Sequence, residues 1–232
     1  MKIKQFKYAS DNLSYLIYGE NEAIAIDGGA VEEILGFIGE AGLRLTVITN
    51  THGHPDHTSG NRALLDGSDA RLRDHNSLAR EGGIALENET LTVFPTPGHT
   101  VDSVTFQCNN CLITGDTLFN GTVGTCFSGD LKAFHRSISR LLSLPMDTKI
   151  YAGHDYVEYA MAFARLVEPD NREIDTYLAS YTPEHVFSRL NDELKVNPFL
   201  RYNDPEMIHI LKERGSATET EYERFEGVMH LE

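Results

Sequence analysis

The chain has 232 residues, of which 41% are hydrophobic, and a formal net charge of −15. This apolar fraction is ordinary for a protein with a folded core and argues against a disordered or fibrous chain. No apolar run approaches the roughly 20 residues that span a bilayer, and the negative charge argues against nucleic acid as the main partner, because phosphate binding requires a dominant basic surface. No apolar signal segment follows the lysines near the N-terminus, so we expect a cytoplasmic protein with neither a membrane nor a nucleic-acid partner.

The first two-thirds of the chain alternates short apolar strands with helices. The helix expected at 31–41 carries its apolar residues on one stripe, and the helix expected at 130–142 is amphipathic and begins at a capping Asp130. The expected strands are 13–18, 23–26, 45–49, 91–94, 103–108, 111–114 and 149–152. This part of the chain is therefore predicted to be a mixed domain of strands and helices.

After residue 156 the character of the sequence changes. Helices are expected at 157–167, 172–179, 184–194, 205–214 and 219–229, and no convincing strand follows 149–152. We therefore predict a boundary near residue 156, with a catalytic domain at 1–156 and a small helical C-terminal domain at 157–232.

Two of the three cysteines form a C-x-x-C motif, Cys108 to Cys111. Such a motif can mark redox or metal chemistry, but a zinc site of this type needs a second C-x-x-C, which the sequence lacks. The intervening Asn109-Asn110 is typical of a tight turn between two strands. We interpret the motif as a β-hairpin.

Four side chains that can bind metals lie within six residues, directly after the expected strand 45–49: His52, His54, Asp56 and His57. Imidazole and carboxylate groups are the usual protein ligands of zinc, iron and manganese. Burying ionisable groups together is costly unless they are paired or bind a metal. The alternative interpretation is a polar surface loop with scattered histidines.

Three more candidate ligands follow strands and adjoin a glycine, which weakens that alternative. They are His99 after strand 91–94, Asp116 after strand 111–114 and His154 after strand 149–152. A scaffold holds two metals accurately when the ligands converge from the ends of rigid strands. These side chains together predict a site for two metal ions.

Five further histidines have no metal-binding residue at a suitable spacing. They are His75, His135, His185, His209 and His230. We expect each of them to lie on the surface or on a helix face.

The order H-x-H-x-D-H, P-G-H-T, G-D-T and G-H along the chain resembles the metallo-β-lactamase superfamily. The resemblance implies an α+β fold, the αβ/βα sandwich of that superfamily. It also implies the ligands of each metal: His52, His54 and His99 for the first, Asp56, His57 and His154 for the second, and Asp116 bridging both.

Three segments narrow the resemblance to glyoxalase II, the hydroxyacylglutathione hydrolase family: 153–156, 163–171 and 197–201. They read G-H-D-Y, F-A-R-L-V-E-P-D-N and N-P-F-L-R, and D-T-L-F at 116–119 also matches. By this resemblance Tyr156 contacts the substrate, and the helical C-terminal domain corresponds to that of the family.

The residues expected to contact glutathione are altered. The family usually places a Lys and a Tyr in the loop after D-T-L-F, where Thr125 and Phe127 stand here, and an Arg and a Lys near the C-terminus, best matched by Glu219 and Tyr222. Hydrogen bonds to charged groups contribute about 1.5–3 kcal/mol, so the missing cations predict an affinity for glutathione about tenfold weaker or more. The resemblance implies thioester hydrolysis, with the glutathione specificity left open.

We predict a metal-dependent thioester hydrolase with two divalent metal ions, most simply zinc, although iron and manganese also suit these ligands. The expected substrate is a small-molecule thioester or ester. Two metals lower the pKa of a shared water to near neutrality, and Asp56 is the residue expected to orient that nucleophile. A thiolate with a pKa of about 8.5 leaves without a strong general acid, which suits a site with no other apparent catalytic acid.

Two alternatives stay open. Persulfide dioxygenases share much of the fold and would bind a single iron through His52, His99 and Asp116, but they generally lack the helical tail with N-P-F-L-R. A lactone is the other ester-like substrate that the same chemistry would hydrolyse.

Overall fold

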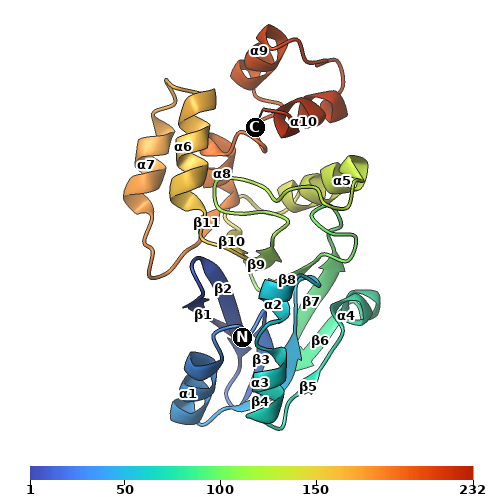
Figure 1. Ribbon diagram of the computed structural model, residues 1–232, viewed down its shortest axis with the longest axis vertical. Helices are drawn as coiled ribbons and strands as arrows, with labels where there is room; N and C mark the ends of the chain where they lie inside the picture. Colours follow the sequence, from blue (N-terminus) through green and yellow to red (C-terminus); the bar gives the residue numbers. More distant parts are fainter. Residues whose placement is uncertain (232) are drawn as a thin grey trace.

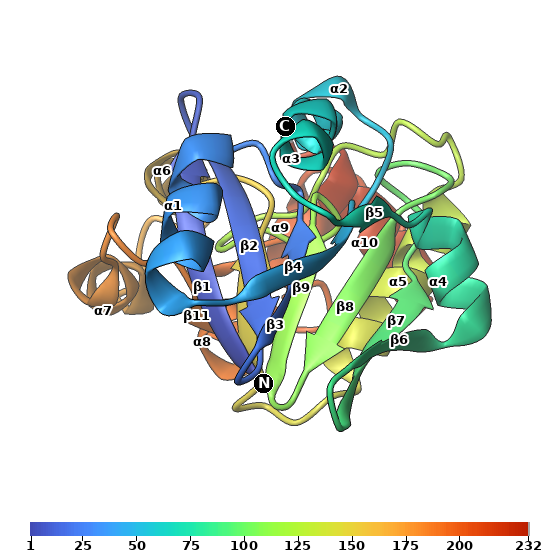
Figure 2. The ribbon, with the colours of Figure 1, turned by 90° about the horizontal axis from the view of Figure 1, so that it is seen from below.

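Two β-sheets form the centre of the structure, which is a computed structural model that describes residues 1–231. The first sheet has the order β1-β2-β3-β4-β5: β1 (Lys2–Tyr8), β2 (Asn12–Tyr18), β3 (Glu22–Ile26), β4 (Arg44–Thr49) and β5 (Arg71–Leu72). The second has the order β11-β10-β9-β8-β7-β6: β6 (Gly83–Leu86), β7 (Glu89–Pro95), β8 (Val104–Cys108), β9 (Cys111–Gly115), β10 (Lys149–Ala152) and β11 (Ser188–Arg189). Figure 2 shows the strands of both sheets in the centre, with helices around them.

Helices cover the outer sides of the sheets and form a separate region at one end. The helices that belong to the sheets are α1 (Val31–Ala41), α2 (Pro55–Thr58), α3 (Asn61–Asp66), α4 (His75–Glu81) and α5 (Leu131–Leu142). The helical region comprises α6 (Val157–Val167), α7 (Glu173–Ser180), α8 (Leu190–Val196), α9 (Pro205–Glu213) and α10 (Glu221–Met229). In Figure 1 this region lies above the sheets, beyond α5.

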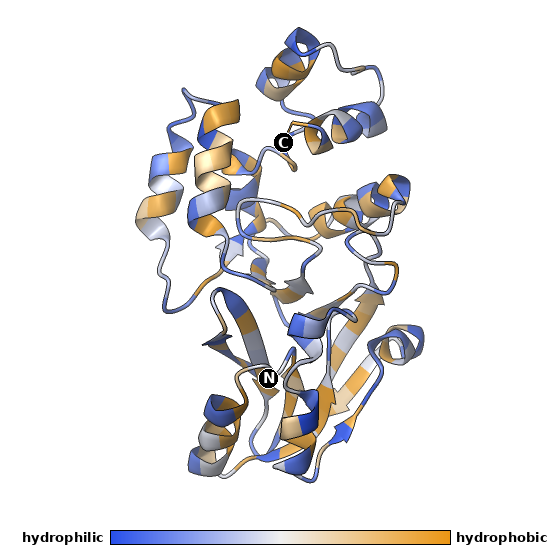
Figure 3. Ribbon diagram, in the orientation of Figure 1, coloured by the Kyte–Doolittle hydropathy of each residue, from blue (hydrophilic) through white to orange (hydrophobic). Residues whose placement is uncertain are grey.

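The strand β2 shows why the sheets pack as a sandwich. Successive side chains of a strand point to opposite faces, and both faces of β2 are buried. Tyr15 points between the sheets, where it joins Val93 and Phe106 of the second sheet, whereas Leu16 points outward to Ile34 of α1. The apolar residues of the strands and of the inner helix faces are orange in Figure 3. The predicted αβ/βα sandwich is confirmed.

The outer face of the second sheet buries α5 and joins the helical region. Leu112 of β9 and Phe134 of α5 belong to one apolar cluster, which also contains Phe199 and Phe225 of the helical region. Asp130 caps α5, as predicted, since its side chain accepts a hydrogen bond from Ala133 N at 2.8 Å. The helical region is therefore packed onto the layer that carries β9 and β10.

Among the differences from the predicted elements, two have a clear physical reason. The N-terminal strand β1 was not predicted, because its lysines are exposed on an edge strand whose one buried residue is the polar Gln5. The helix expected at 184–194 begins only at Leu190, and β11 precedes it, paired with β10. The reason is a distant contact: the side-chain amide of Gln5 binds both the backbone N–H and the carbonyl of Val186.

The interpretation of the C-x-x-C motif as a hairpin is confirmed. Cys108 and Cys111 are paired across β8 and β9, and Asn109 has a positive φ of 53° in the turn between them. Within residues 1–231, no helix has the length and apolar character needed to cross a membrane.

Candidate metal centre

The structure brings all the predicted ligands together at one edge of the sheets, next to α2 in Figure 1. The loop from β4 into α2 carries the first four, while the others follow β7, β9 and β10. They form two groups: His52, His54, His99 and Asp116 in one, and Asp56, His57 and His154 in the other. Strand ends from both sheets therefore supply the side chains, as the sequence predicts.

The first group surrounds one point. His52 Nε2 and His99 Nε2 lie 3.0 and 3.1 Å from His54 Nδ1, and His99 Nε2 lies 3.5 Å from Asp116 Oδ2. Bonds of about 2.0–2.1 Å to a tetrahedral ion place its ligand atoms about 3.3–3.4 Å apart. These distances fit one ion held by three imidazoles and a carboxylate.

The second group has similar spacings. His57 Nε2 lies 3.2 Å from His154 Nε2, and Asp56 Oδ2 lies 3.3 Å from His154 Nε2 and 3.6 Å from His57 Nε2. The group fits a second ion, with the exposed side of Asp56 toward solvent.

Asp116 lies between the two groups. Its Oδ1 is 3.2 Å from His57 Nε2, and its Oδ2 is 3.5 Å from both His99 Nε2 and His154 Nε2. Oδ1 is also buried without a hydrogen bond of acceptable geometry. A buried carboxylate oxygen without a hydrogen-bond partner fits a ligand position, and the placement suits a carboxylate shared by two ions.

Two carboxylates contact the Nδ1 atoms of the histidines in the second group. Asp27 Oδ2 lies 2.9 Å from His57 Nδ1, and Asp11 Oδ1 lies 2.8 Å from His154 Nδ1. Such partners fix the ring orientation and leave Nε2 free for a metal. Sequence reasoning missed both carboxylates, although Asp27 follows β3 in the way that the predicted ligands follow their strands.

Asp27 is fully buried and serves more than one partner. Its Oδ1 accepts a hydrogen bond from Thr51 N at 2.7 Å, and its Oδ2 accepts one from Thr51 Oγ1 at 2.7 Å. Thr51 Oγ1 in turn lies 3.1 Å from His52 Nδ1. Asp27 thereby connects a histidine of each group.

His99 is anchored by the backbone. Its Nδ1 donates to the carbonyl oxygen of Thr125 at 3.0 Å, so the segment that follows Asp116 along the chain sets the orientation of this imidazole. Thr125 therefore orients His99 through its backbone carbonyl and not through its side chain.

Two glycines leave the room that the ligands occupy. A Cβ at position 153 would lie 2.1 Å from Asp116 Oδ1 and 2.8 Å from His57 Cε1. A Cβ at position 124 would lie 1.9 Å from the Asp116 carbonyl oxygen. The glycines next to the ligands are thus required by close packing around them.

The electrostatics favour ligation by the first group. Burial, followed by the nearby His57, lowers the pKa of His52 to about 4, and burial also lowers the pKa of His99. Although burial opposes it, the close imidazoles of His154 and His57 lower the pKa of Asp116. Neutral imidazoles and an ionised carboxylate are the forms that bind metals.

The second group holds a proton when no cation is bound. Burial works against the charge, but the neighbouring Asp27 and Asp116 raise the pKa of His57 to about 11. His154 has a raised pKa for similar reasons, through Asp116 and Asp11. A cation at this group would replace that positive charge.

Asp56 is the most accessible of the predicted ligands, with a side chain 46% exposed. Its Oδ2 accepts a hydrogen bond from Asn12 Nδ2 at 3.0 Å, and its carbonyl oxygen accepts one from Tyr8 OH at 2.9 Å. Partial burial opposes ionisation, but His57 and Asn12 keep the pKa of Asp56 below its usual value. The carboxylate is therefore an ionised acceptor at the mouth of the site.

Aromatic rings flank both groups. The ring of Tyr156 is stacked on His154, with centroids 5.0 Å apart, and it meets Phe119 edge to face. On the other side, the ring of Phe127 lies 5.3 Å from that of His99 and is 68% exposed. Tyr156 therefore lies beside the second group and Phe127 beside the first.

The C-terminal positions at which the family would place cations lie on or just before α10. The hydroxyl of Tyr222 donates to Glu226 at 3.1 Å, and Lys132 Nζ of α5 lies 5.5 Å from the ring centroid of Tyr222. Glu219 is exposed just before the helix. One cation, from α5, is therefore close to Tyr222.

The other histidines lie apart from the two groups. His75 is the first residue of helix α4, where it is buried and lies 3.0 Å from Asp102 Oδ2. That Asp102 also faces Gly53, in the loop of the first ligands, so the pair supports this loop. His135 lies on α5 among aromatic rings, and His185, His209 and His230 are exposed.

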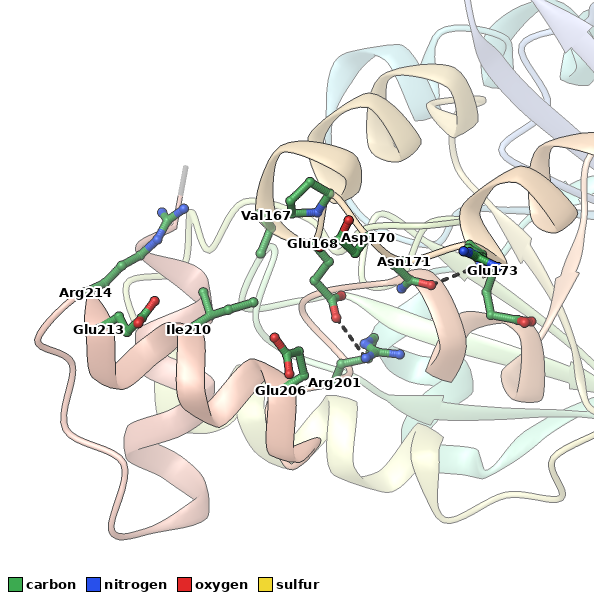
Figure 4. A pocket seen from close by; sticks show the side chains of 12 residues that line it. Val167, Glu168, Asp170, Asn171, Glu173, Arg201, Glu206, Ile210, Glu213 and Arg214 are labelled. Carbon is green, nitrogen blue, oxygen red and sulfur yellow. Dashed lines mark hydrogen bonds and ion pairs between the residues drawn. The ribbon is translucent and has the colours of Figure 1, made fainter.

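A cavity of about 780 Å³ lies away from the metal centre, between the end of α6, the start of α7 and α9 (Figure 4). On its wall Glu168 Oε1 accepts a hydrogen bond from Arg201 Nη2 at 2.8 Å. None of the predicted metal ligands lines this cavity.

Two family models match the chain. Residues 9–87 match the metallo-beta-lactamase superfamily, and residues 155–228 match the hydroxyacylglutathione hydrolase C-terminus. The hydroxyacylglutathione hydrolase of Chromohalobacter salexigens is 32% identical over 227 residues, which cover 89% of each chain. That of Nitrosococcus oceani is 36% identical over 225 residues, which cover 87% of this chain and 86% of the relative.

Solved structures share the fold. The crystal structure of ETHE1 from Myxococcus xanthus has a TM-score of 0.69 at 23% identity and covers 99% of this chain and 90% of its own. A metallo-beta-lactamase from Staphylococcus aureus has a TM-score of 0.61 at 22% identity and covers 91% of this chain and 66% of its own.

Proposed function

The chain belongs to the hydroxyacylglutathione hydrolase family of the metallo-β-lactamase superfamily, and from this premise we propose that it is a thioester hydrolase that uses two divalent metal ions. The observation that carries the proposal is the pair of ligand groups with Asp116 between them. We propose His52, His54 and His99 as ligands of one ion, Asp56, His57 and His154 as ligands of the other, and Asp116 as the bridge. We further propose that residues 1–156 form the catalytic domain and residues 157–232 the helical domain.

The residues fit the metals on three grounds. The distances between donor atoms match the edges of a tetrahedral shell, Asp116 Oδ1 is buried without a hydrogen bond, and the Nδ1 atoms of His57 and His154 are held by carboxylates. Imidazoles with carboxylates suit zinc, and also iron or manganese. A bound pair of such ions supplies a deprotonated water at neutral pH and polarises a carbonyl group.

The chain's own groups explain the reaction class. Asp56 is ionised, reachable from solvent and held by Asn12 at 3.0 Å, so it can orient a water molecule toward a bound carbonyl carbon. Within the described residues, no Lys, Arg or Tyr side chain hydrogen-bonds to a side chain of the two ligand groups, and the Tyr8 hydroxyl binds only the backbone carbonyl of Asp56. A thiolate leaves without a strong acid, because its conjugate acid has a pKa of about 8.5, whereas an amine requires protonation. The arrangement therefore favours thioesters, and lactones next, over amides.

The aromatic rings indicate where the substrate lies. We propose that Tyr156 contacts the substrate beside the second group, since its ring is stacked on His154. Phe127 occupies the opposite side with a ring that has no hydroxyl. The Thr125 carbonyl binds His99, and Tyr222 carries no positive charge. We therefore propose that the affinity for glutathione is weakened. Lys132, which lies near Tyr222, would restore only part of it.

The alternative of a one-iron persulfide dioxygenase would use His52, His99 and Asp116. These residues do lie in one group, but the match at residues 155–228 and the relatives over most of the chain favour the hydrolase. The likeness to ETHE1 is a likeness of fold.

A panel of substrates tests the proposal. Purified protein supplied with zinc should hydrolyse acyl thioesters at the same rate with and without oxygen, and lactones more slowly. Oxygen uptake in proportion to added glutathione persulfide, with no thioester cleavage, would assign the protein to the dioxygenases instead.

A further inference from the structure

A buried glutamate of the helical region lies far from the predicted ligands in the sequence but is bound to the segment that connects two of them. Glu193 in α8 has no exposed surface. Burying a carboxylate is costly unless hydrogen bonds satisfy it. The hydrogen-bond partners of Glu193 therefore indicate its role.

Glu193 binds donors from both parts of the molecule. Its Oε2 accepts hydrogen bonds from Gly121 N at 2.9 Å and from Asn197 Nδ2 at 2.9 Å. Its Oε1 accepts one from Tyr177 OH at 2.7 Å. Tyr177 and Asn197 belong to the helical region, whereas Gly121 follows β9 in the sheet layer.

Gly121 lies in the segment 117–125, which begins after the shared ligand Asp116. The segment ends at Thr125, whose carbonyl oxygen accepts the hydrogen bond from His99 Nδ1. Between them, Phe119 packs edge to face on His154, with centroids 6.0 Å apart. One segment therefore sets the surroundings of three predicted ligands.

The helical region holds this segment at further points. Asn120 Nδ2 donates to Ser188 Oγ at 2.7 Å, and Gly121 has a φ of +92° with no room for a Cβ beside Met161 of α6. Glu193 adds a side-chain acceptor that binds this segment and the helical region at the same time.

We propose that Glu193 is a positioning residue for the metal centre: through Gly121 it fixes the segment 117–125, and thereby the orientation of Asp116 and His99. The inference rests on the proposed metal centre. It explains how a helical region that provides none of the predicted metal ligands is coupled to the metals. Loss of residues that orient ligands weakens metal affinity about 10–100-fold.

Zinc affinity tests the inference without using activity. The full-length apo-protein is titrated with Zn²⁺ in competition with a chromogenic chelator, at a temperature well below its thermal transition. The variants are Glu193→Ala, Glu193→Asp, which keeps the charge but shortens the reach to Gly121, and Glu193→Gln, which can still accept from Gly121. Glu168→Ala is the matched control, because Glu168 is also a buried carboxylate of the helical region, where it forms an ion pair with Arg201.

The expected result is a zinc affinity about tenfold weaker or more for Glu193→Ala and Glu193→Asp, and close to the wild-type value for Glu193→Gln. Glu168→Ala should lower the thermal transition and leave zinc affinity unchanged. If Glu193→Ala does not fold, the zinc affinity of Glu193→Asp tests the inference. Wild-type affinity in that variant, or an equal loss in Glu168→Ala, would overturn the inference. A wild-type protein that binds fewer than two zinc ions would overturn the proposed function, and the inference with it.

Discussion

Replacing Gly153 by alanine adds one methyl group at the centre of the proposed metal site. The new Cβ would lie 2.1 Å from Asp116 Oδ1, whereas real Cβ atoms essentially never approach closer than 3.0 Å. The carboxylate oxygen or the backbone must therefore move by 3.0 − 2.1, or 0.9 Å. A metal site tolerates deviations of about 0.2 Å in its ligand distances, so the shift far exceeds what both shells can accommodate. We expect metal affinity to fall by more than about a hundredfold, or about 2.8 kcal/mol.

Metal content after dialysis, measured by inductively coupled plasma mass spectrometry, checks this expectation. Circular dichroism should show that Gly153→Ala keeps its fold, since position 153 does not have a left-handed backbone conformation. Gly36→Ala is the control: a Cβ there meets nothing within 4 Å in the helix α1, and the change should keep both metals and raise stability by about 0.5–1 kcal/mol. Two retained metals in Gly153→Ala would refute the packing argument.

Four other predictions concern separate parts of the site. Asp116→Ala should lose both metals, because a shared carboxylate completes each shell; a variant that keeps one metal as tightly as before would contradict the shared role. Asp27→Ala should weaken zinc binding about 10–100-fold, through the loss of the 2.9 Å contact to His57 Nδ1; unchanged affinity in a competition titration would count against it. Without a cation, the pKa of His57 is raised from 6.5 to about 11. Between these pH values, metal binding to the second group should release at least one proton, and metal affinity should increase as pH rises. Calorimetry in two buffers counts the released protons, and a count of zero would contradict the assignment of His57 as a ligand. The KM for S-D-lactoylglutathione should be high, and Glu219→Arg with Tyr222→Lys should lower it without affecting small neutral thioesters; a wild-type KM in the low micromolar range would show that other residues bind glutathione.

The elements that the sequence predicts well are those whose pattern is local. The helix α1 and the strand β10 have the predicted bounds, because each is a continuous apolar pattern that ends at turn residues. The strand β1 alternates lysines with apolar residues, and its identity as a strand depends on pairing with β2. The start of α8 depends on Gln5, which binds Val186 across 181 residues of chain, and no local pattern records such a contact.

The ligand groups were predictable for a related reason. Each predicted ligand lies in the segment that follows a strand, including the short helix α2 after β4, so the residue type and its position after a strand together predict the site. Asp11 and Asp27 carry less signal, because a carboxylate beside a turn is common and only the folded chain brings it to a histidine. Glu193 carries none, since its role depends on Gly121, which is 72 residues away.

The count of metal ions that activity requires tests the central claim most directly. Apo-protein is titrated with Zn²⁺ without oxygen, and hydrolysis of an acyl thioester is measured at each addition. The account predicts that activity rises until two equivalents are bound and that Asp116→Ala stays inactive throughout. Full activity at one equivalent, or no hydrolysis with two zinc ions bound, would contradict it.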